Sequence, residues 1–230
     1  MGGRNNLFKQ IIGTWRCEDG GLFFLCFSFV LCSFLRTFAV REFKIMVLEL
    51  NETLIEGAER TVTMLAEEGQ MVCLTGGTAT CRADLLLAMM GLKMVKSGYV
   101  CIDGEPLSAE MADEFRALMA YAPDRLTAEG EVKRYEPPTV QEVFALKANR
   151  ELPISNGILA EEMKRTGADG EKARLLAVAM LRQKPILLVD NPAPESAGYL
   201  RKLAQEEGKL VVATSAEQAI VEAAHIVVEL

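Results

Sequence analysis

The chain has 230 residues, of which 50% are hydrophobic, and it carries a formal net charge of −7 at pH 7. This length and composition suit one globular domain with a full apolar core and exclude a disordered chain. Residues 1–45 contain six Lys or Arg and three Asp or Glu, a net charge of +3, which leaves −10 for residues 46–230. An acidic body argues against a nucleic-acid-binding role.

Residues 1–45 form a leader whose composition differs from the rest of the chain. It holds eight of the ten Phe residues and the only Trp, and residues 22–35 are an apolar stretch. This stretch has about the length of a signal-peptide core and is shorter than the roughly 20 residues of a membrane-spanning helix. Three interpretations stay open: a membrane anchor, a signal sequence, and an upstream extension wrongly included before a true start at Met46. We favour the last, because an α/β pattern begins at Met46.

The body, residues 46–230, alternates short apolar runs with amphipathic helical patterns. Strands are expected at residues 46–50, 61–66, 71–75, 99–102, 117–122, 184–190, 210–214 and 226–230. Helices are expected at residues 83–92, 109–116, 140–146, 158–165, 171–183, 195–207 and 217–224. This alternation predicts a mostly parallel α/β sheet flanked by helices. Cys73, Cys81 and Cys101 have no metal-ligand spacing and are expected to be free, mostly buried thiols.

The strand at 71–75 leads into a glycine-containing loop and then a helix, which is the frame of a phosphate-binding loop. The pattern G-x-x-x-x-G-K-[ST] uses its glycines to let backbone N–H groups wrap a phosphate, its lysine to reach the outer oxygens, and its hydroxyl to hold Mg²⁺. Gly76 keeps the first glycine, whereas Cys81, Arg82 and Ala83 fill the other three places. The candidate phosphate-binding residues are Gly76, Gly77, Thr78, Ala79, Thr80, Cys81, Arg82, Ala83 and Asp84.

A second feature near the other end of the body supports a nucleotide-binding fold. The apolar run 184–189 ends in Asp190, and such a run indicates a buried parallel strand with its carboxylate at the C-terminal edge. A P-loop protein holds its metal with an Asp at this place, so Asp190 is the candidate metal ligand. The alternative is that Asp190 only caps the exit of the strand.

Several landmarks follow one another in a fixed order along the body. They are residues 68–76, 97–107, 120–124, 139–142, 167–174, 190–192 and 211–215. In this order they resemble the nucleotide-binding subunit of ABC transporters, within the P-loop NTPase superfamily, over essentially all of residues 46–230. The resemblance implies a P-loop NTPase-like, mostly parallel sheet flanked by helices, with an antiparallel edge region and a short helical subdomain at about residues 139–182.

The resemblance also implies cofactors, partners and a location. The cofactors would be ATP and Mg²⁺. The partners would be a homologous ABC subunit, in a homodimer or a heterodimer, and a membrane permease, with no nucleic acid. Dimers of the family hold ATP between one subunit's phosphate loop and the other's signature motif. The location would be cytoplasmic and peripheral, at the inner face of the plasma membrane, where the leader could serve as an anchor.

The residues at the family's catalytic positions depart from its pattern. Asp124 stands where the family has the metal-contacting Gln, Asn191 where it has the general-base Glu, and Ser215 where it has the switch His. Asn191 can orient a water molecule but cannot accept its proton, so ATP hydrolysis is expected to be severely impaired. The signature positions, two of which replace the family's Ser and first Gly, are Gly167, Ala168, Asp169, Gly170 and Glu171.

Phosphate binding is itself in question at this loop. Arg82 can grip a phosphate, but its planar fork does not fit a lysine's position by default. Ala83 lacks the hydroxyl that holds Mg²⁺, and a carboxylate at Asp84, expected in the first helical turn, repels a phosphate while it favours the helix dipole. Our hypothesis is that Asp84 and Arg82 partly satisfy this helix N-terminus internally, so that nucleotide binds weakly or not at all. No aromatic residue between Asn51 and Gln70 can stack on adenine.

Three functional hypotheses remain. The leading one is an ABC-type ATP-binding subunit that has lost most of its catalytic residues and acts as a non-hydrolysing or weakly hydrolysing partner in a membrane transport complex. The alternative is an ATP-independent scaffold or regulatory binding module on the same fold, and the third is an active ATPase that uses substitute residues. Asp169 is expected to mark a helix N-terminus and His225 to start a strand, neither with a catalytic role.

Overall fold

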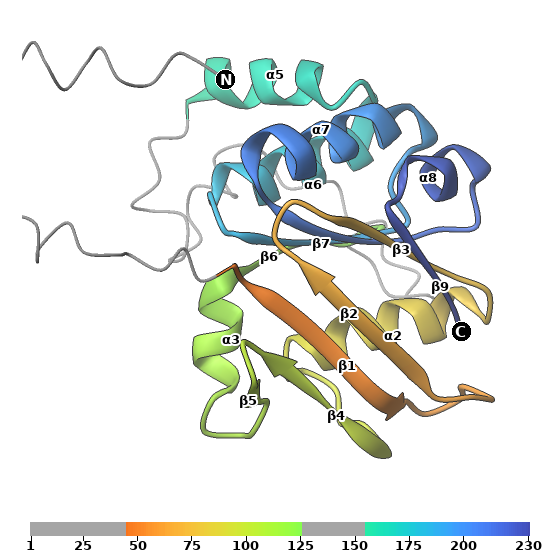
Figure 1. Ribbon diagram of the computed structural model, residues 1–230. Coiled ribbons are helices and arrows are strands. Elements are labelled where there is room, and N and C mark those ends of the chain that lie inside the picture. Colours follow the sequence, from red (N-terminus) through yellow and green to blue (C-terminus); the bar gives the residue numbers. More distant parts are fainter. Residues whose placement is uncertain (1–44, 126–154) are drawn as a thin grey trace, which may run out of the picture. The chain divides into compact units, whose positions relative to one another are not determined.

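The computed structural model describes residues 45–125 and 155–230 (Figure 1). The leader up to residue 44, the helix expected at 140–146 and the first part of the expected helical subdomain lie outside these residues. None of the described helices combines the length and the hydropathy that a membrane crossing needs.

An antiparallel sheet forms the first part of the described chain. Its strands are β1 (Val47–Leu54), β2 (Val62–Glu67), β4 (Ser97–Ile102) and β5 (Glu105–Pro106), in the order β2-β1-β4-β5. In β2, every second side chain is buried, namely Val62, Met64 and Ala66, which is the pattern of a sheet that packs one face on a core. The expected turn at Asp103 joins β4 to β5. Oδ1 of the Asp103 side chain accepts a hydrogen bond from Val47 N at 2.9 Å. The expected antiparallel region is thus confirmed.

A β-bulge interrupts the pairing of β1 with both neighbouring strands. Against β4 the register shifts between Asn51 and Leu54, and Glu52 takes a left-handed backbone with φ +43°. Gly98 of β4 lies against this bulge, and a Cβ placed on it would stand 2.3 Å from Asn51 O. Only glycine lets β4 approach the bulge this closely. The bulge carries β1 to Leu54, beyond the strand expected at 46–50.

A parallel sheet carries the rest of the described fold. Its strands are β6 (Met119–Ala122), β7 (Ile186–Asp190), β8 (Leu210–Thr214), β3 (Met71–Thr75) and β9 (Ile226–Glu229), in the order β6-β7-β8-β3-β9. The pairings between neighbours in this sheet are all parallel. The predicted mostly parallel α/β sheet is therefore confirmed, and the ends of these strands lie within two residues of the expected ones.

Helices follow the strands of the parallel sheet or lead back into it. They are α2 (Ala79–Met89), α3 (Ala112–Leu118), α5 (Asn156–Arg165), α6 (Gly170–Leu181), α7 (Ala197–Glu207) and α8 (Gln218–Ala223). Of these helices, α2 and α3 connect the parallel sheet with the antiparallel sheet. Each helix corresponds to an expected one, but α2 begins at Ala79 and not at Ala83. The reason is its N-cap, because Thr78 Oγ1 accepts a hydrogen bond from Cys81 N at 3.1 Å and starts the helix directly after the two glycines.

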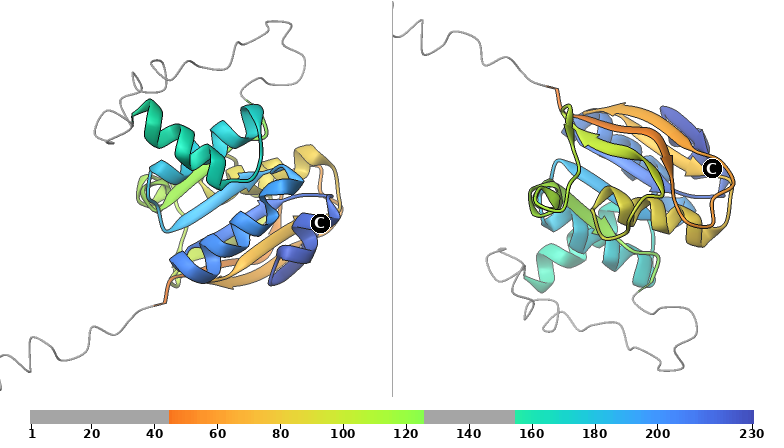
Figure 2. Two further views of the ribbon diagram at one scale, coloured as in Figure 1. Left: turned by 90° about the horizontal axis from the view of Figure 1, so that it is seen from above. Right: turned by 90° about the horizontal axis from the view of Figure 1, so that it is seen from below.

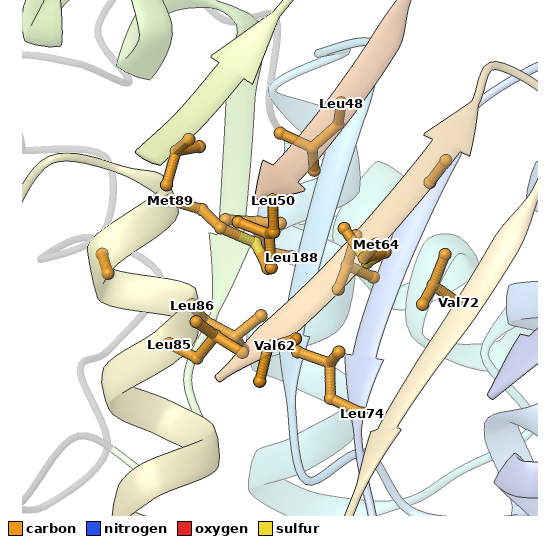
Figure 3. Packing of buried hydrophobic residues seen from close by; sticks show 14 of the residues in the cluster. Leu48, Leu50, Val62, Met64, Val72, Leu74, Leu85, Leu86, Met89 and Leu188 are labelled. Atoms are coloured by element: carbon orange, nitrogen blue, oxygen red, sulfur yellow. The ribbon is translucent and has the colours of Figure 1, made fainter. Parts of the chain in front are cut away.

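Alternate side chains of the parallel strands face two separate cores. Val72 and Leu74 belong to one core, and Met71 and Cys73 to the other, because successive side chains of a strand point to opposite faces. The first core joins the antiparallel sheet and α2 to the parallel sheet, and Figure 3 shows Leu86 of α2 among the strand side chains. The second core lies under α6, α7 and α8, so that these helices cover one face of the parallel sheet, while α2 and the antiparallel sheet cover the other (Figure 2). This arrangement leaves the C-terminal ends of β3, β7 and β8 as the place where a ligand site forms.

Candidate functional site

The loop after β3 is the first part of the candidate site. Gly76 and Gly77 both have left-handed backbones, with φ +72° and +54°. A Cβ on Gly76 would stand 2.8 Å from Glu229 Cγ and 3.0 Å from Leu230 O, and Leu230 N donates to Thr75 O at 2.8 Å. The close approach of the chain after β9 therefore requires glycine at the first position of the phosphate-loop pattern.

The other candidate residues of the loop belong to α2 or cap it. Thr78 is the N-cap residue, and the first two turns of the helix contain Ala79, Thr80, Cys81, Arg82, Ala83 and Asp84. The prediction that Asp84 lies in the first helical turn is wrong, because α2 begins at Ala79. The Asp84 carboxylate forms an ion pair with Lys93 beyond the end of α2. It does not satisfy the N–H groups at the start of the helix, contrary to our hypothesis.

Arg82 is buried, with 9% of its surface exposed, and its guanidinium contacts the loop that precedes its own helix. Its Nη1 donates hydrogen bonds to Gly76 O at 2.7 Å and to Gly77 O at 3.3 Å. Within residues 45–125 and 155–230, Arg82 Nε has no hydrogen-bond partner. Arg82 thus does bond internally, as hypothesised, but to loop carbonyls and not to the N–H groups of the helix.

Asp190 ends β7, where the apolar run placed it. Its Oδ1 accepts a hydrogen bond from Thr214 Oγ1 at 2.7 Å, and Thr214 is its register partner on β8. Burial raises the pKa of the Asp190 carboxyl, while the hydrogen bond from Thr214 and the charge of Arg82 act against that rise. Sequence reasoning missed Thr214. The signal for Thr214 was that it is the last residue of the strand expected at 210–214, just as Asp190 is the last residue of the strand expected at 184–190.

Asn191 connects residues from three separate parts of the chain. Its backbone is left-handed, with φ +48°, and its N–H donates to Thr214 O at 3.0 Å. Its Nδ2 donates to Asp124 Oδ1 at 3.0 Å. Lys172 Nζ, from α6, donates to Asn191 O at 2.6 Å and lies 2.9 Å from Asp124 Oδ1. The structure thus brings Asp124 and Asn191 together and adds Lys172, which sequence reasoning missed.

A cavity of about 450 Å³ lies between the start of α2 and the ends of β6 and β7. Its lining contains candidates from the start of α2, from the residues after β6 and from the end of β7, namely Ala79, Thr80, Arg82, Ala83, Asp124, Asp190 and Asn191. Tyr121 also lines it, and burial, with nearby carboxylates, raises the pKa of this phenol to about 12. Four of the phosphate-binding candidates thus share a cavity with the metal-binding candidate, whereas Gly76, Gly77, Thr78, Cys81 and Asp84 are not among its lining residues.

Ser215 does not line this cavity. It is fully buried, its N–H donates to Leu74 O at 3.0 Å, and its Oγ accepts a hydrogen bond from Glu217 N at 3.0 Å. The hydroxyl is thus used within the turn that leads from β8 to α8, and the structure does not bring it to the other catalytic candidates.

A second cavity, of about 630 Å³, adjoins the glycine loop on the side of β9. It is lined by Gly77, Thr78 and Cys81, by residues 57–60, and by the chain end after β9. No aromatic side chain is among these lining residues, so the described part of the chain offers no ring on which an adenine could stack here. Its wall is instead charged, because Arg60 pairs with Glu229.

The candidate signature residues lie in the turn between α5 and α6 and in the first two positions of α6, which begins at Gly170. Ala168 is buried, whereas the four exposed residues are Gly167, Asp169, Gly170 and Glu171. Asp169 occupies the N-cap position of α6, as expected, but its side chain makes no capping hydrogen bond. The carboxylate of Asp169 is therefore exposed to solvent and does not cap α6. None of the exposed signature residues lines the cavity at Asp190.

The remaining candidates have structural roles. His225 directly precedes β9, and its Nδ1 accepts a hydrogen bond from Met71 N at 2.9 Å. The free cysteines of the body, Cys73, Cys81 and Cys101, are buried as expected. Among the residues that the structure describes, no group of three or more His, Cys, Asp or Glu side chains is arranged to hold a metal ion.

Comparisons with known proteins bear on the family. The family model described as "ABC transporter" matches residues 60–194. A putative ABC transporter ATP-binding protein of Treponema denticola is 27% identical over 190 residues, which is 76% of this chain. The match covers 34% of that protein, so this chain spans about a third of the length of its relative.

Two solved structures share the fold. MJ0796, a bacterial ABC transporter cassette solved as a dimer, is 17% identical with a TM-score of 0.62, over 80% of this chain and 94% of that one. The cbiO1 protein of Clostridium perfringens, part of the ABC transporter complex cbiONQ, is 13% identical with a TM-score of 0.56, over 78% of this chain and 82% of that one. Because the family model covers more than half of the residues, the chain belongs to the ABC transporter family and has the fold of its ATP-binding cassettes, within the P-loop NTPase superfamily.

Proposed function

We propose that this chain is an ABC ATP-binding subunit with weak or absent ATP hydrolysis, which acts as a partner of a competent subunit in a membrane transport complex. The network of Asn191, Asp124 and Lys172 carries the proposal. Hydrolysis needs a group that accepts a proton from the attacking water. An amide cannot accept it, and Asn191 already uses its Nδ2 to hold Asp124 at 3.0 Å.

The carboxylates of the cavity do not replace the missing base. Asp124 Oδ1 faces two donors, Asn191 Nδ2 at 3.0 Å and Lys172 Nζ at 2.9 Å. A carboxylate oxygen that receives two donors has little capacity left to hold a water molecule. Asp190 Oδ1 is engaged by the Thr214 hydroxyl. Each carboxylate thus has one of its two oxygens engaged by protein donors, and we expect neither to position water as the family's general-base Glu does.

The glycine loop supports the same proposal. Arg82 Nη1 donates to two carbonyls of its own loop, and Ala83 offers no hydroxyl to a metal ion. What remains for a phosphate is the charge of the Arg82 guanidinium and the N–H groups at the start of α2, since the first N–H groups of a helix have no partner within it. We therefore expect nucleotide to bind more weakly than to an intact loop.

A homologous subunit is the partner that we propose. MJ0796 was solved as a dimer, and cbiO1 is part of a transporter complex. The exposed start of α6, with Asp169 at its N-cap and Glu171 in its first turn, is the surface that would meet the partner's nucleotide. A permease at the inner face of the plasma membrane would complete the assembly, with this chain at its cytoplasmic side.

The test is the release of phosphate from Mg-ATP by the full chain, compared with Asp190→Asn. This control keeps the size of the side chain and removes its charge. We expect the same background rate from both proteins, because in this proposal neither carboxylate of the cavity acts as the base. Turnover that is abolished by Asp190→Asn would refute the proposal and favour an active ATPase with substitute residues.

The partner role is tested separately, by light scattering on an equimolar mixture with an ABC subunit of the same cell that has an intact phosphate loop. We expect a heterodimer that forms with ATP and not without it. A heterodimer that forms equally in both conditions would favour the ATP-independent scaffold. If no heterodimer forms in either condition, the partner role is wrong.

A further inference from the structure

The cavity at Asp190 lacks the hydroxyl with which a phosphate-binding loop of the usual pattern holds Mg²⁺. Mg²⁺ binds in an octahedron of oxygen atoms, usually from one or two carboxylates, a loop hydroxyl, waters and the phosphates. Ala83 stands where the hydroxyl should be and carries no side-chain oxygen. Asn191 points its amide nitrogen, a donor, at Asp124. The donor set is thus poorer than that of an intact phosphate-binding loop, because the hydroxyl of the motif is missing and the Asn191 amide nitrogen is turned into the network.

Each of the two carboxylates of the cavity already has one oxygen engaged by another group of the protein. Asp124 faces Lys172 Nζ at 2.9 Å, and Asp190 accepts the hydroxyl of Thr214 at 2.7 Å. These contacts compete with a metal ion for Oδ1 of both residues, and only the second oxygen of each carboxylate stays open to it.

A fixed positive charge also lines the cavity. Arg82 lines it together with Asp190, and the guanidinium is held in place by Gly76 O and Gly77 O at 2.7 and 3.3 Å. Arg82 and Lys172 balance Asp190 and Asp124 without any metal ion. A divalent cation would be repelled by the buried guanidinium, since charges in a buried site are poorly screened.

We propose that this site binds the phosphates of its ligand without Mg²⁺, with Arg82 as the permanent cation and the N–H groups at the start of α2 as donors. The inference rests on the proposed function, because it concerns the ligand of the same site. An arginine that is always charged can replace part of the charge that a metal would bring to a polyphosphate.

The test is isothermal titration of the full chain with ATP and with inorganic tripolyphosphate, each in EDTA and in excess MgCl₂. We expect dissociation constants that differ by less than about threefold between the two buffers. The variant Ala83→Ser restores the missing hydroxyl, and we expect it to bind at least about tenfold more tightly with Mg²⁺ than with EDTA. The matched control Ala109→Ser, at an exposed position away from the cavity lining, should behave like the unchanged chain.

Two results would overturn the inference. One is binding by the unchanged chain that Mg²⁺ strengthens about tenfold or more, and the other is no detectable binding of either probe in either buffer. Arg82→Gln should lose binding in EDTA, and because this residue is buried, the folding of the variant is checked by circular dichroism. Ala83→Ser keeps the test decisive if Arg82→Gln does not fold. Metal-dependent binding without turnover would overturn this inference alone, whereas turnover lost on Asp190→Asn would refute the proposed function.

Discussion

Gly98→Ala tests how closely the antiparallel sheet packs at its bulge. Gly98 has φ +73°, and a Cβ there would stand 2.3 Å from Asn51 O and 2.4 Å from Glu52 O. Both oxygens belong to the backbone, so no side chain can rotate to make room. Gly104 is the matched control, because it has φ +83° and a Cβ on it would meet nothing within 4 Å.

The difference between the two variants follows from the structure. An alanine in the left-handed region costs about 1–2 kcal/mol, and Gly104→Ala should lose only this amount. At Gly98, β1 and β4 must also separate by about 1 Å, which we expect to cost two backbone hydrogen bonds at about 1 kcal/mol each. The free energy of unfolding should therefore fall by about 3–4 kcal/mol in Gly98→Ala, a large part of the about 5–15 kcal/mol of a typical domain.

The assay is urea unfolding followed by far-ultraviolet circular dichroism, with equal slopes required for the comparison. The expected result is a midpoint for Gly98→Ala well below that for Gly104→Ala. Two variants whose free energies of unfolding agree within about 0.5 kcal/mol would show that the close approach at the bulge is absent in solution, and the reasoning would be refuted.

Two further predictions concern buried polar groups. Tyr199 donates a hydrogen bond to Glu162, whose side chain is buried. Tyr199→Phe should therefore lower the free energy of unfolding by about 2 kcal/mol and Tm by about 4–8 °C. The control Tyr99→Phe, at a half-exposed ring, should leave Tm unchanged. Equal Tm values for the two variants in a thermal melt would contradict this. Burial raises the pKa of the Cys73 thiol from 9.0 to about 11, so the folded state holds this proton more tightly than the unfolded state does. The free energy of unfolding should therefore fall by about 3 kcal/mol as the pH rises from about 9 to about 11. Urea unfolding of Cys73→Ala should lack this part of the loss, and an unchanged pH dependence would show that the thiol is not responsible.

Local sequence patterns were sufficient where an element depends on its own residues. The run at 71–75 is apolar, is followed by glycine, and forms β3 at Met71–Thr75. The start of α2 was missed because the motif pattern suggested a longer loop. Thr78 is an N-cap residue type, and its hydrogen bond to Cys81 N begins the helix earlier than that pattern implies.

The candidate site was predictable in part. The order of landmarks along the chain places Asp124, Asp190 and Asn191 at the ends of neighbouring parallel strands, and these residues line one cavity. Lys172 could not be found in this way, because it reaches Asp124 from a helix that follows much later in the chain. Its contact depends on how α6 packs on the sheet, which no local periodicity describes.

The sequence by itself determined the alternation of strands and helices, and with it the parallel sheet, because hydrophobic periodicity and turn residues act over a few neighbouring positions. It also determined which chemical groups are missing, since Ala83 has no hydroxyl and Asn191 no carboxylate. Only the tertiary structure decided which charges pair. Asp84 bonds to Lys93 and not to the helix start, and Arg82 bonds to its own loop, because ion pairs and hydrogen bonds depend on distances between side chains that are set only when the elements pack.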